Sequence, residues 1–170
     1  MEVFARQLSL PRQQRLFDYW LSLRRGEGWP ARRDIRCRDL WELLPNLLLM
    51  QVRPLPEGVR VRLAGSDLWD IYGGELTGRT LNDDCWGAHA DYWREVYADS
   101  AQAPRPANGH LLLNQGEEAA ARGVLFWMRL PLVDEDGGLW LLGLDVLEPA
   151  SQWNDLAPAD SIGSNRDSVA

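Results

Sequence analysis

The residues of this chain that are best suited to bind a ligand are aromatic. Nine tryptophans, four tyrosines and three phenylalanines occur among 170 residues. Each ring offers a large apolar surface, and tryptophan and tyrosine add a polar atom that can form a hydrogen bond. Tryptophans in this number suit a lined pocket or a self-association surface, although the same rings could simply fill a core.

Residue patterns for catalysis are missing from the sequence. It contains no G-x-S-x-G, H-E-x-x-H, P-loop or G-x-G-x-x-G motif. All 18 basic residues are arginines, which excludes a lysine nucleophile. Asp83 and Asp84 form a carboxylate pair, but their position before a predicted helix indicates capping. We therefore expect that the protein is not an enzyme, with a small hydrolase or isomerase as the alternative.

Composition excludes several other classes. The net charge of −7 argues against non-specific binding to nucleic acid or to an anionic membrane, because both depend on basic surfaces. No apolar run approaches the roughly 20 residues that span a bilayer, and the first residues do not resemble a secretory signal. The only cysteines, Cys37 and Cys85, form no C-x-x-C motif, so we expect reduced thiols and a cytoplasmic location.

The elements that must position the aromatic residues begin with a helix. Apolar residues at helical spacing predict an amphipathic helix over Leu10–Arg25, with Pro11 at its start and Gly26 after its end. Pro30 forces an extended linker, and Asp39 could cap a short helix over Leu40–Leu44.

The apolar period then changes to two, which predicts strands. Leu47–Arg53 and Val59–Leu63 have this character. Three further strands are expected over Gly109–Asn114, over Val124–Leu132, which is long and rich in apolar residues, and over Leu139–Leu147. The acidic, glycine-rich segment 134–138 is a hairpin turn that pairs the last two strands. Helices are expected between the second and third strands, over Leu68–Tyr72 and Trp86–Ala98. The fold class is therefore α+β, with an antiparallel sheet and helices over one face.

Several short motifs follow one another along the chain: Tyr19-Trp20, Pro30 with Arg32, Asp34-Ile35, Leu43-Leu44-Pro45, Arg62-Leu63-Ala64-Gly65-Ser66 and the stretch from Tyr72 to Arg79. Their joint order resembles that of stand-alone bacterial PAS-like proteins. The resemblance covers Leu16 to Val146. It implies the PAS fold, with a five-stranded antiparallel sheet and a leading helix that packs on the sheet or at a dimer interface. The chain then divides into a leading helical segment (1–28), the PAS-like domain (29–149) and a disordered tail (150–170).

The PAS resemblance also implies a cavity between the sheet and the longer helix. Nine residues are expected to line it: Trp69, Tyr72, Trp86, Trp93, Tyr97, His110, Asn114, Phe126 and Met128. Arg129 is a further polar candidate. The cofactor or ligand cannot be named from these residues, and plain core packing is the alternative.

Arginines and the rarer residues give narrower expectations. Arg60 and Arg62 are expected on the face opposite Val59, Val61 and Leu63. Under a helix they would need a carboxylate partner, from Asp18 or Glu42, while Arg62 could alternatively clamp a carboxylate ligand. Arg79 is expected to fix its own loop.

Haem and flavin chemistry are not favoured. Haem-binding PAS domains use a histidine of the longer helix, but His89 lacks any supporting ligand, and two separated histidines form no metal site. Cys85 lies about one helical turn beyond the position of a flavin-reactive cysteine, and the surrounding motif is absent.

These features together predict a cytoplasmic sensory or regulatory module that binds a small apolar or carboxylate-bearing ligand. We expect a homodimer formed through Leu16, Tyr19, Trp20 and Leu23 of the leading helix, without nucleic-acid or membrane partners. The alternative is a ligand-free dimeric adaptor with a filled aromatic core.

Overall fold

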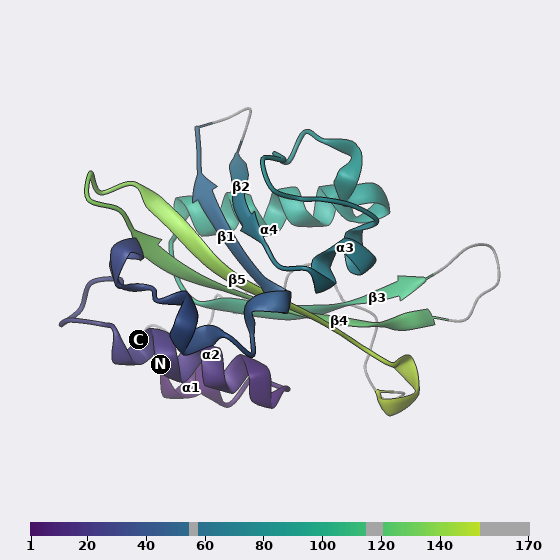
Figure 1. The fold of residues 1–170 in the computed structure, drawn as a ribbon, viewed down its shortest axis with the longest axis horizontal. Helices are drawn as coiled ribbons and strands as arrows, with labels where there is room; N and C mark the ends of the chain where they lie inside the picture. Colours follow the sequence, from purple (N-terminus) through teal and green to yellow (C-terminus); the bar gives the residue numbers. More distant parts are fainter. Residues whose placement is uncertain (55–57, 115–120, 154–170) are drawn as a thin grey trace.

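One five-stranded antiparallel sheet organises the chain. The computed structural model describes residues 1–54, 58–114 and 121–153. The sheet order is β2-β1-β5-β4-β3 (Figure 1). The strands are β1 (Leu47–Val52), β2 (Val59–Ala64), β3 (Ala107–Asn114), β4 (Ala121–Val133) and β5 (Leu139–Glu148). The predicted α+β class and antiparallel sheet are confirmed, and the turn over 134–138 joins β4 to β5 as expected.

Both faces of the sheet are covered, and this explains the long apolar runs in β4 and β5. Side chains alternate between the faces along a strand. Leu125 and Trp127 of β4 pack into one cluster, whereas Phe126 and Met128 pack into the other. A strand buried on both faces shows a continuous apolar run rather than an alternating pattern, so its sequence does not indicate which side a residue faces.

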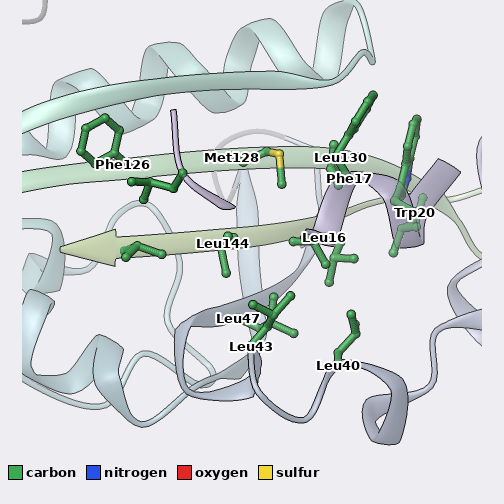
Figure 2. Close-up of a cluster of buried hydrophobic side chains, with 14 of the residues drawn as sticks. Leu16, Phe17, Trp20, Leu40, Leu43, Leu47, Phe126, Met128, Leu130 and Leu144 are labelled. Atoms are coloured by element: carbon green, nitrogen blue, oxygen red, sulfur yellow. The ribbon is translucent and has the colours of Figure 1, made fainter. Parts of the chain in front are cut away.

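The leading helix packs on one face of the sheet. This helix, α2 (Pro11–Ser22), is preceded by a single turn, α1 (Glu2–Ala5), that was not expected. Leu16, Phe17 and Trp20 are completely buried against β4 and β5 (Figure 2). The Trp20 indole Nε1 donates to the Pro131 carbonyl at 2.9 Å, which ties the helix to β4.

This packing changes the expected dimer interface. Leu16 and Trp20 were expected to contact a second copy, but their side chains are fully enclosed by their own chain. Tyr19 and Leu23 are half-buried, and the Tyr19 hydroxyl accepts a hydrogen bond from the Arg36 amide at 2.8 Å. The apolar stripe of the helix is therefore used to cover the sheet.

The segment after α2 forms short turns instead of the helix expected over Leu40–Leu44. Three 3-10 turns follow one another: η1 (Arg32–Asp34), η2 (Cys37–Leu40) and η3 (Leu44–Asn46). Asp39 lies inside η2 and caps no helix. Short 3-10 turns of this kind are common in segments that connect longer elements.

The other face of the sheet is covered by α3 (Asp67–Tyr72), η4 (Asp84–His89) and α4 (Ala90–Gln102). The longer helix was expected to begin at Trp86, but this residue lies in η4. Gly87 has φ 52°, a left-handed conformation that breaks the helical path before Ala90. Figure 1 shows α4 and α3 on the side of the sheet opposite α1 and α2.

A bulge in β2 alters one expected orientation. Leu49 pairs with Leu63 and Met50 pairs with Val61, so Arg62 is an extra residue. Leu63 therefore lies on the face opposite Val61, where the sequence alternation had placed them together. It is 37% exposed, at the margin of the layer formed by α2.

The C-terminal boundary lies later than expected. Residues Ala150–Gln152 form a 3-10 turn, η5, and the Trp153 ring lies 4.6 Å from the Phe126 ring. The first residues of the predicted tail thus pack on the sheet, and residues 154–170 lie outside the described residues. Among the helices described, none has the length and apolar character needed to cross a bilayer.

Candidate functional site

A buried ion pair lies at the centre of the sheet, under α4. The Arg129 guanidinium of β4 donates to both carboxylate oxygens of Asp145 on β5, at 2.5 and 3.1 Å. Both side chains are 0% exposed. Such a two-point contact is the strongest form of an arginine–carboxylate interaction.

The hairpin register creates this ion pair. Trp127 pairs with Asp145 and Arg129 pairs with Gly143, so Arg129 and Asp145 are diagonal neighbours on one face. A Cβ atom on Gly143 would lie 3.1 Å from Arg129 Nη1 and 2.9 Å from the Met50 methyl group. Glycine at this position therefore leaves the space that the guanidinium occupies.

Two tyrosines connect the ion pair to the covering helices. The Tyr72 hydroxyl at the end of α3 donates to Asp145 Oδ2 at 2.6 Å. Arg129 Nε donates to the Tyr97 hydroxyl of α4 at 3.2 Å, and Arg129 Nη1 also donates to the Met128 carbonyl at 3.0 Å. One charged pair thus holds β4, β5, α3 and α4 together.

The electrostatic setting keeps the arginine charged and the tyrosines neutral. Burial, the largest single cause, lowers the pKa of Arg129, but the adjacent Asp145 carboxylate together with Tyr97 and Tyr72 outweighs it, and the pKa is raised. Burial raises the pKa of Tyr97 to about 12. Burial and the Asp145 charge also raise the pKa of Tyr72 well above its usual value. Both phenols therefore remain protonated near neutral pH and act as hydrogen-bonding groups.

Aromatic rings surround the ion pair. The Arg129 Cζ atom lies 4.8 Å from the centre of the Trp93 ring and 5.7 Å from that of Trp127, at cation–π distances. Trp93 stacks on Tyr97 at 5.8 Å, and Trp86 lies 6.2 Å from Trp93. These rings contact one another and occupy the space between α4 and the sheet.

The structure brings four of the nine predicted pocket residues together at this site. Tyr72, Trp86, Trp93 and Tyr97 belong to the cluster under α4. Trp69 is 57% exposed on α3 and takes no part in it. The backbone of Asn114 pairs with Ala121, and its side chain lies outside the described residues.

Three other predicted pocket residues lie on the wrong face of the sheet. Phe126 and Met128 pack in the cluster under α2 (Figure 2), and His110 pairs with Phe126 in the register of β3 and β4. The odd-numbered positions of β4, Trp127 and Arg129, face α4 instead. Strand alternation is the reason, because β4 is apolar on both faces.

Asp145 and Trp127 were missed at the sequence level, although a signal for them existed. Arg129 and Asp145 are single charged residues within two apolar strands that flank one hairpin turn. Counting outward from the turn places Trp127 opposite Asp145 and Arg129 opposite Gly143, as observed. Two opposite charges at such positions indicate a buried pair, because an unpaired buried charge is costly.

A polar groove at the surface shares one residue, Tyr72, with this site. It has a volume of about 550 Å³ and lies beside the end of α3 and the start of η4. Its lining residues are Tyr72, Gly73, Gly74, Glu75, Arg79, Asn82, Asp83, Asp84 and Cys85. Tyr72 is half-buried and belongs both to the groove and, through its hydroxyl, to the buried ion pair.

Residues around the groove stabilise their own loop. The Arg79 Nε atom donates to the Glu75 carbonyl at 3.5 Å, a long contact that agrees with the predicted loop-fixing role. The Thr80 amide donates to the Asp83 carboxylate at 2.5 Å. Burial raises the pKa of the half-buried Cys85 thiol, so the thiol stays protonated at neutral pH.

The expected partners of Arg60 and Arg62 are engaged elsewhere. Glu42 forms an ion pair with Arg15, and Asp18 accepts a hydrogen bond from Gln14. Arg62 is exposed at the bulge of β2. The structural ion pair of this chain therefore involves Arg129, which lies on the other face of the sheet from α2.

Comparisons with known proteins give a family and several distant structures. No curated protein matches this chain. The light-oxygen-voltage (LOV) domain of a fungal photoreceptor is 15% identical, with a TM-score of 0.48, covering 78% of this chain and 88% of that chain. The PAS domain of Bordetella pertussis BvgS is 21% identical, with a TM-score of 0.45, covering 65% and 83%. The LOV domain of Aureochrome1 is 12% identical, with a TM-score of 0.43, covering 68% and 90%.

The family assignment rests on a match along most of the sequence. The family model of the PAS domain matches residues 8–144, from just before α2 to the middle of β5. This range agrees with the resemblance that the sequence motifs indicated. The chain belongs to the PAS domain family.

Proposed function

We propose that this chain is a sensory PAS module in which a small aromatic ligand with a hydrogen-bond donor replaces Tyr72 at the buried ion pair. The observation that supports the proposal is the connection from the surface groove, through Tyr72, to the completely buried Arg129–Asp145 pair. Tyr72 lines this groove and is only half-buried. Its displacement exposes the ion pair and the adjoining rings to an incoming molecule.

The charges at the site define the class of ligand. Arg129 and Asp145 neutralise each other, so a carboxylate-bearing ligand would add an uncompensated negative charge in a buried site. The Tyr72 phenol is a neutral aromatic donor, and its ring lies 5.5 Å from Trp86 and 6.4 Å from Trp93. A phenol-like ligand reproduces both contacts. The apolar class of ligand is therefore favoured over the carboxylate class.

The signal would come from the loss of the hydrogen bond through which Tyr72 connects α3 to β5. Its hydroxyl bonds the end of α3 to β5, and Gly73, with φ 74°, begins the loop that lines the groove. When a ligand takes the place of the phenol, α3 loses this bond. Ligand binding can shift the equilibrium between the two positions of α3 only as far as the affinities of the ligand for the two arrangements differ. A partner protein or a second copy of the chain then binds differently to the two positions of α3.

Binding of p-cresol, the free form of the tyrosine side chain, tests this proposal. We expect p-cresol to change the fluorescence of Trp86 and Trp93 and to raise the melting temperature. Tyr72→Phe should bind p-cresol more tightly than wild type, because the competing internal donor is lost. Tyr92→Phe is the matched control, since Tyr92 accepts a hydrogen bond from Trp127 and does not line the groove. No response in either wild type or Tyr72→Phe would overturn the proposal.

The second candidate function is the ligand-free adaptor. The direct ring contacts between Trp86, Trp93 and Tyr97 favour it, because these side chains already fill the interior. In that case Tyr72 never leaves Asp145, and the chain acts only through its surface. Native mass spectrometry of the purified protein separates the two, since a retained small molecule supports the sensor, whereas apo protein that also ignores p-cresol supports the adaptor.

The proposal assigns the chain no catalytic step and a cytoplasmic location. Cys37 and Cys85 are both free thiols, which suits a reducing compartment. Cys37 is exposed and would be oxidised readily elsewhere.

A further inference from the structure

Strand β3 forms one edge of the sheet with an unusual composition. In the described part of the chain it pairs only with β4, over eight residues. Along its outer side every second residue turns its N–H and C=O groups away from β4, as in any edge strand. Figure 1 shows β3 at the margin of the sheet, running beside β4.

The opposite edge, β2, is protected against pairing. The Gly78 amide donates to the Val61 carbonyl at 2.8 Å, and the Val61 amide donates to the Arg79 carbonyl at 2.9 Å. A bulge at Arg62 and two arginines add to this cover. Natural sheets use such coverings, bulges and charges to prevent edge-to-edge association.

Among the described residues, β3 has no charged residue, no bulge within its regular part and no backbone partner on its outer side, and the Asn108 side chain donates to the Gln7 carbonyl at 3.2 Å. Its sequence is Ala-Asn-Gly-His-Leu-Leu-Leu-Asn, without an acidic residue, an arginine or a proline. Its register shifts only at the far end, between Leu113 and Asn114. The whole chain contains 25 acidic residues and 18 arginines, but none of them lies in β3.

The side chains of β3 extend both layers of the core to the edge. Leu112 packs against the cluster under α2, and Leu113 packs against the cluster under α4. Both are half-buried, so apolar surface remains on each face at the margin. A further strand beside β3 would cover both leucines and continue both layers.

We propose that β3 pairs antiparallel with β3 of a second copy, which joins two sheets into one of ten strands. An antiparallel strand edge is complementary to itself about a two-fold axis, so one surface serves both partners. Each copy carries a net charge of −7, and an uncharged strand is where two such copies meet with the least repulsion. Leu16 and Trp20, two of the four residues expected at a helix-mediated dimer interface, are buried within the chain.

This contact is small and connects to the buried site. Two eight-residue edges bury little area, so the dimer forms and dissociates with concentration. Ala107 of β3 is the register partner of Arg129, one strand away from the ion pair. The proposal does not depend on the ligand or on the sensory role.

Sedimentation velocity over a range of concentrations tests the β3 dimer. Wild type should show a monomer–dimer equilibrium. His110 lies near the middle of β3, so its two copies come close across the two-fold axis. His110→Glu and His110→Arg should each weaken the dimer by at least about tenfold, because like charges then face each other. An equimolar mixture of the two variants should restore dimers, now as heterodimers.

Two further variants keep the test independent of folding. His110→Ala should retain the dimer, and Arg62→Glu, on the protected edge, should leave it unchanged. Circular dichroism checks that each variant has the wild-type fold. A wild type that stays monomeric at every concentration overturns the proposal. So does dimerisation that His110→Glu and His110→Arg leave unchanged, or that their mixture fails to restore.

Discussion

The two layers that cover the sheet are built from different chemistry. The layer under α2 is apolar, and its helix is fixed inside the layer by neutral hydrogen bonds such as Trp20 Nε1 to the Pro131 carbonyl, with the Arg15–Glu42 ion pair at the exposed surface. The layer under α4 contains a buried ion pair, with tyrosines from α3 and α4 bonded to it. Burying charges is costly even when they are paired, and hydrophobic replacements of such pairs are often as stable. Under the proposed function, the α2 layer provides stability, whereas the α4 layer provides a site whose state can change.

Breaking the ion pair on one side should have the largest effect on stability. Arg129→Met leaves the Asp145 carboxylate buried without a cation, and we expect a loss of about 3–5 kcal/mol in the free energy of unfolding. Urea denaturation measures this loss. The double variant Arg129→Met/Asp145→Leu should recover most of it, because no uncompensated charge remains. A double variant no more stable than the single one would mean that the pair is needed for folding.

Truncating the apolar layer should cost stability without affecting the site. Leu16→Ala removes a fully buried side chain, and we expect a loss of about 3 kcal/mol. The same variant should bind p-cresol with unchanged affinity at a temperature where it remains folded. Altered binding would show that the two layers are coupled through the sheet.

Alkaline pH should weaken only the α4 layer. The pKa of Tyr97 is raised to about 12 in the folded chain, whereas an unfolded tyrosine titrates near pH 10. The stability that comes from the protonated phenol is therefore complete below about pH 10 and is lost as the pH rises towards 12. We expect a loss of about 2 kcal/mol over this range, measured by denaturation at fixed pH values. Tyr97→Phe should show a shallower pH dependence, and Leu16→Ala an unchanged one.

The smallest expected effect on stability comes from Tyr92, at the margin of the hydrogen-bond network in the α4 layer. Tyr92 accepts a neutral hydrogen bond from Trp127 at 2.8 Å and does not contact the ion pair through it. Tyr92→Phe should cost about 1 kcal/mol, the usual contribution of one neutral hydrogen bond. Equilibrium unfolding measures this cost, and a loss as large as that of Arg129→Met would place Tyr92 within the charged network.

The architecture could be predicted from the sequence because its signals are local. Period-two alternation, the acidic turn over 134–138 and the amphipathic helix each predict one element, and all were confirmed within a few residues. The bulge at Arg62 gave no such signal, because it depends on how β1 and β2 align. Leu63 was therefore assigned to the wrong face.

The site was predicted only in part, for a physical reason. Tyr72, Trp86, Trp93 and Tyr97 lie on elements that face the sheet from one side, so their direction follows from the fold. Successive residues of β4 face opposite layers. Because the strand is apolar on both faces, its sequence does not show which layer a given residue faces. Phe126 and Met128 were assigned to the wrong face and Trp127 was missed, whereas Arg129, a polar candidate from the sequence, lies at the site. The charged residues within the apolar parts of β4 and β5, Arg129 and Asp145, were the usable signal, and the hairpin register would have paired them.

The most direct test of the sensory site is the proton NMR signal of the Tyr72 hydroxyl. A short hydrogen bond to a buried carboxylate, here 2.6 Å, shifts this proton downfield and slows its exchange with water. Its resonance can be assigned by its loss in Tyr72→Phe. If p-cresol replaces the phenol, the Tyr72 resonance disappears as the ligand saturates the protein. A Tyr72 resonance that persists unchanged at every p-cresol concentration would contradict the account.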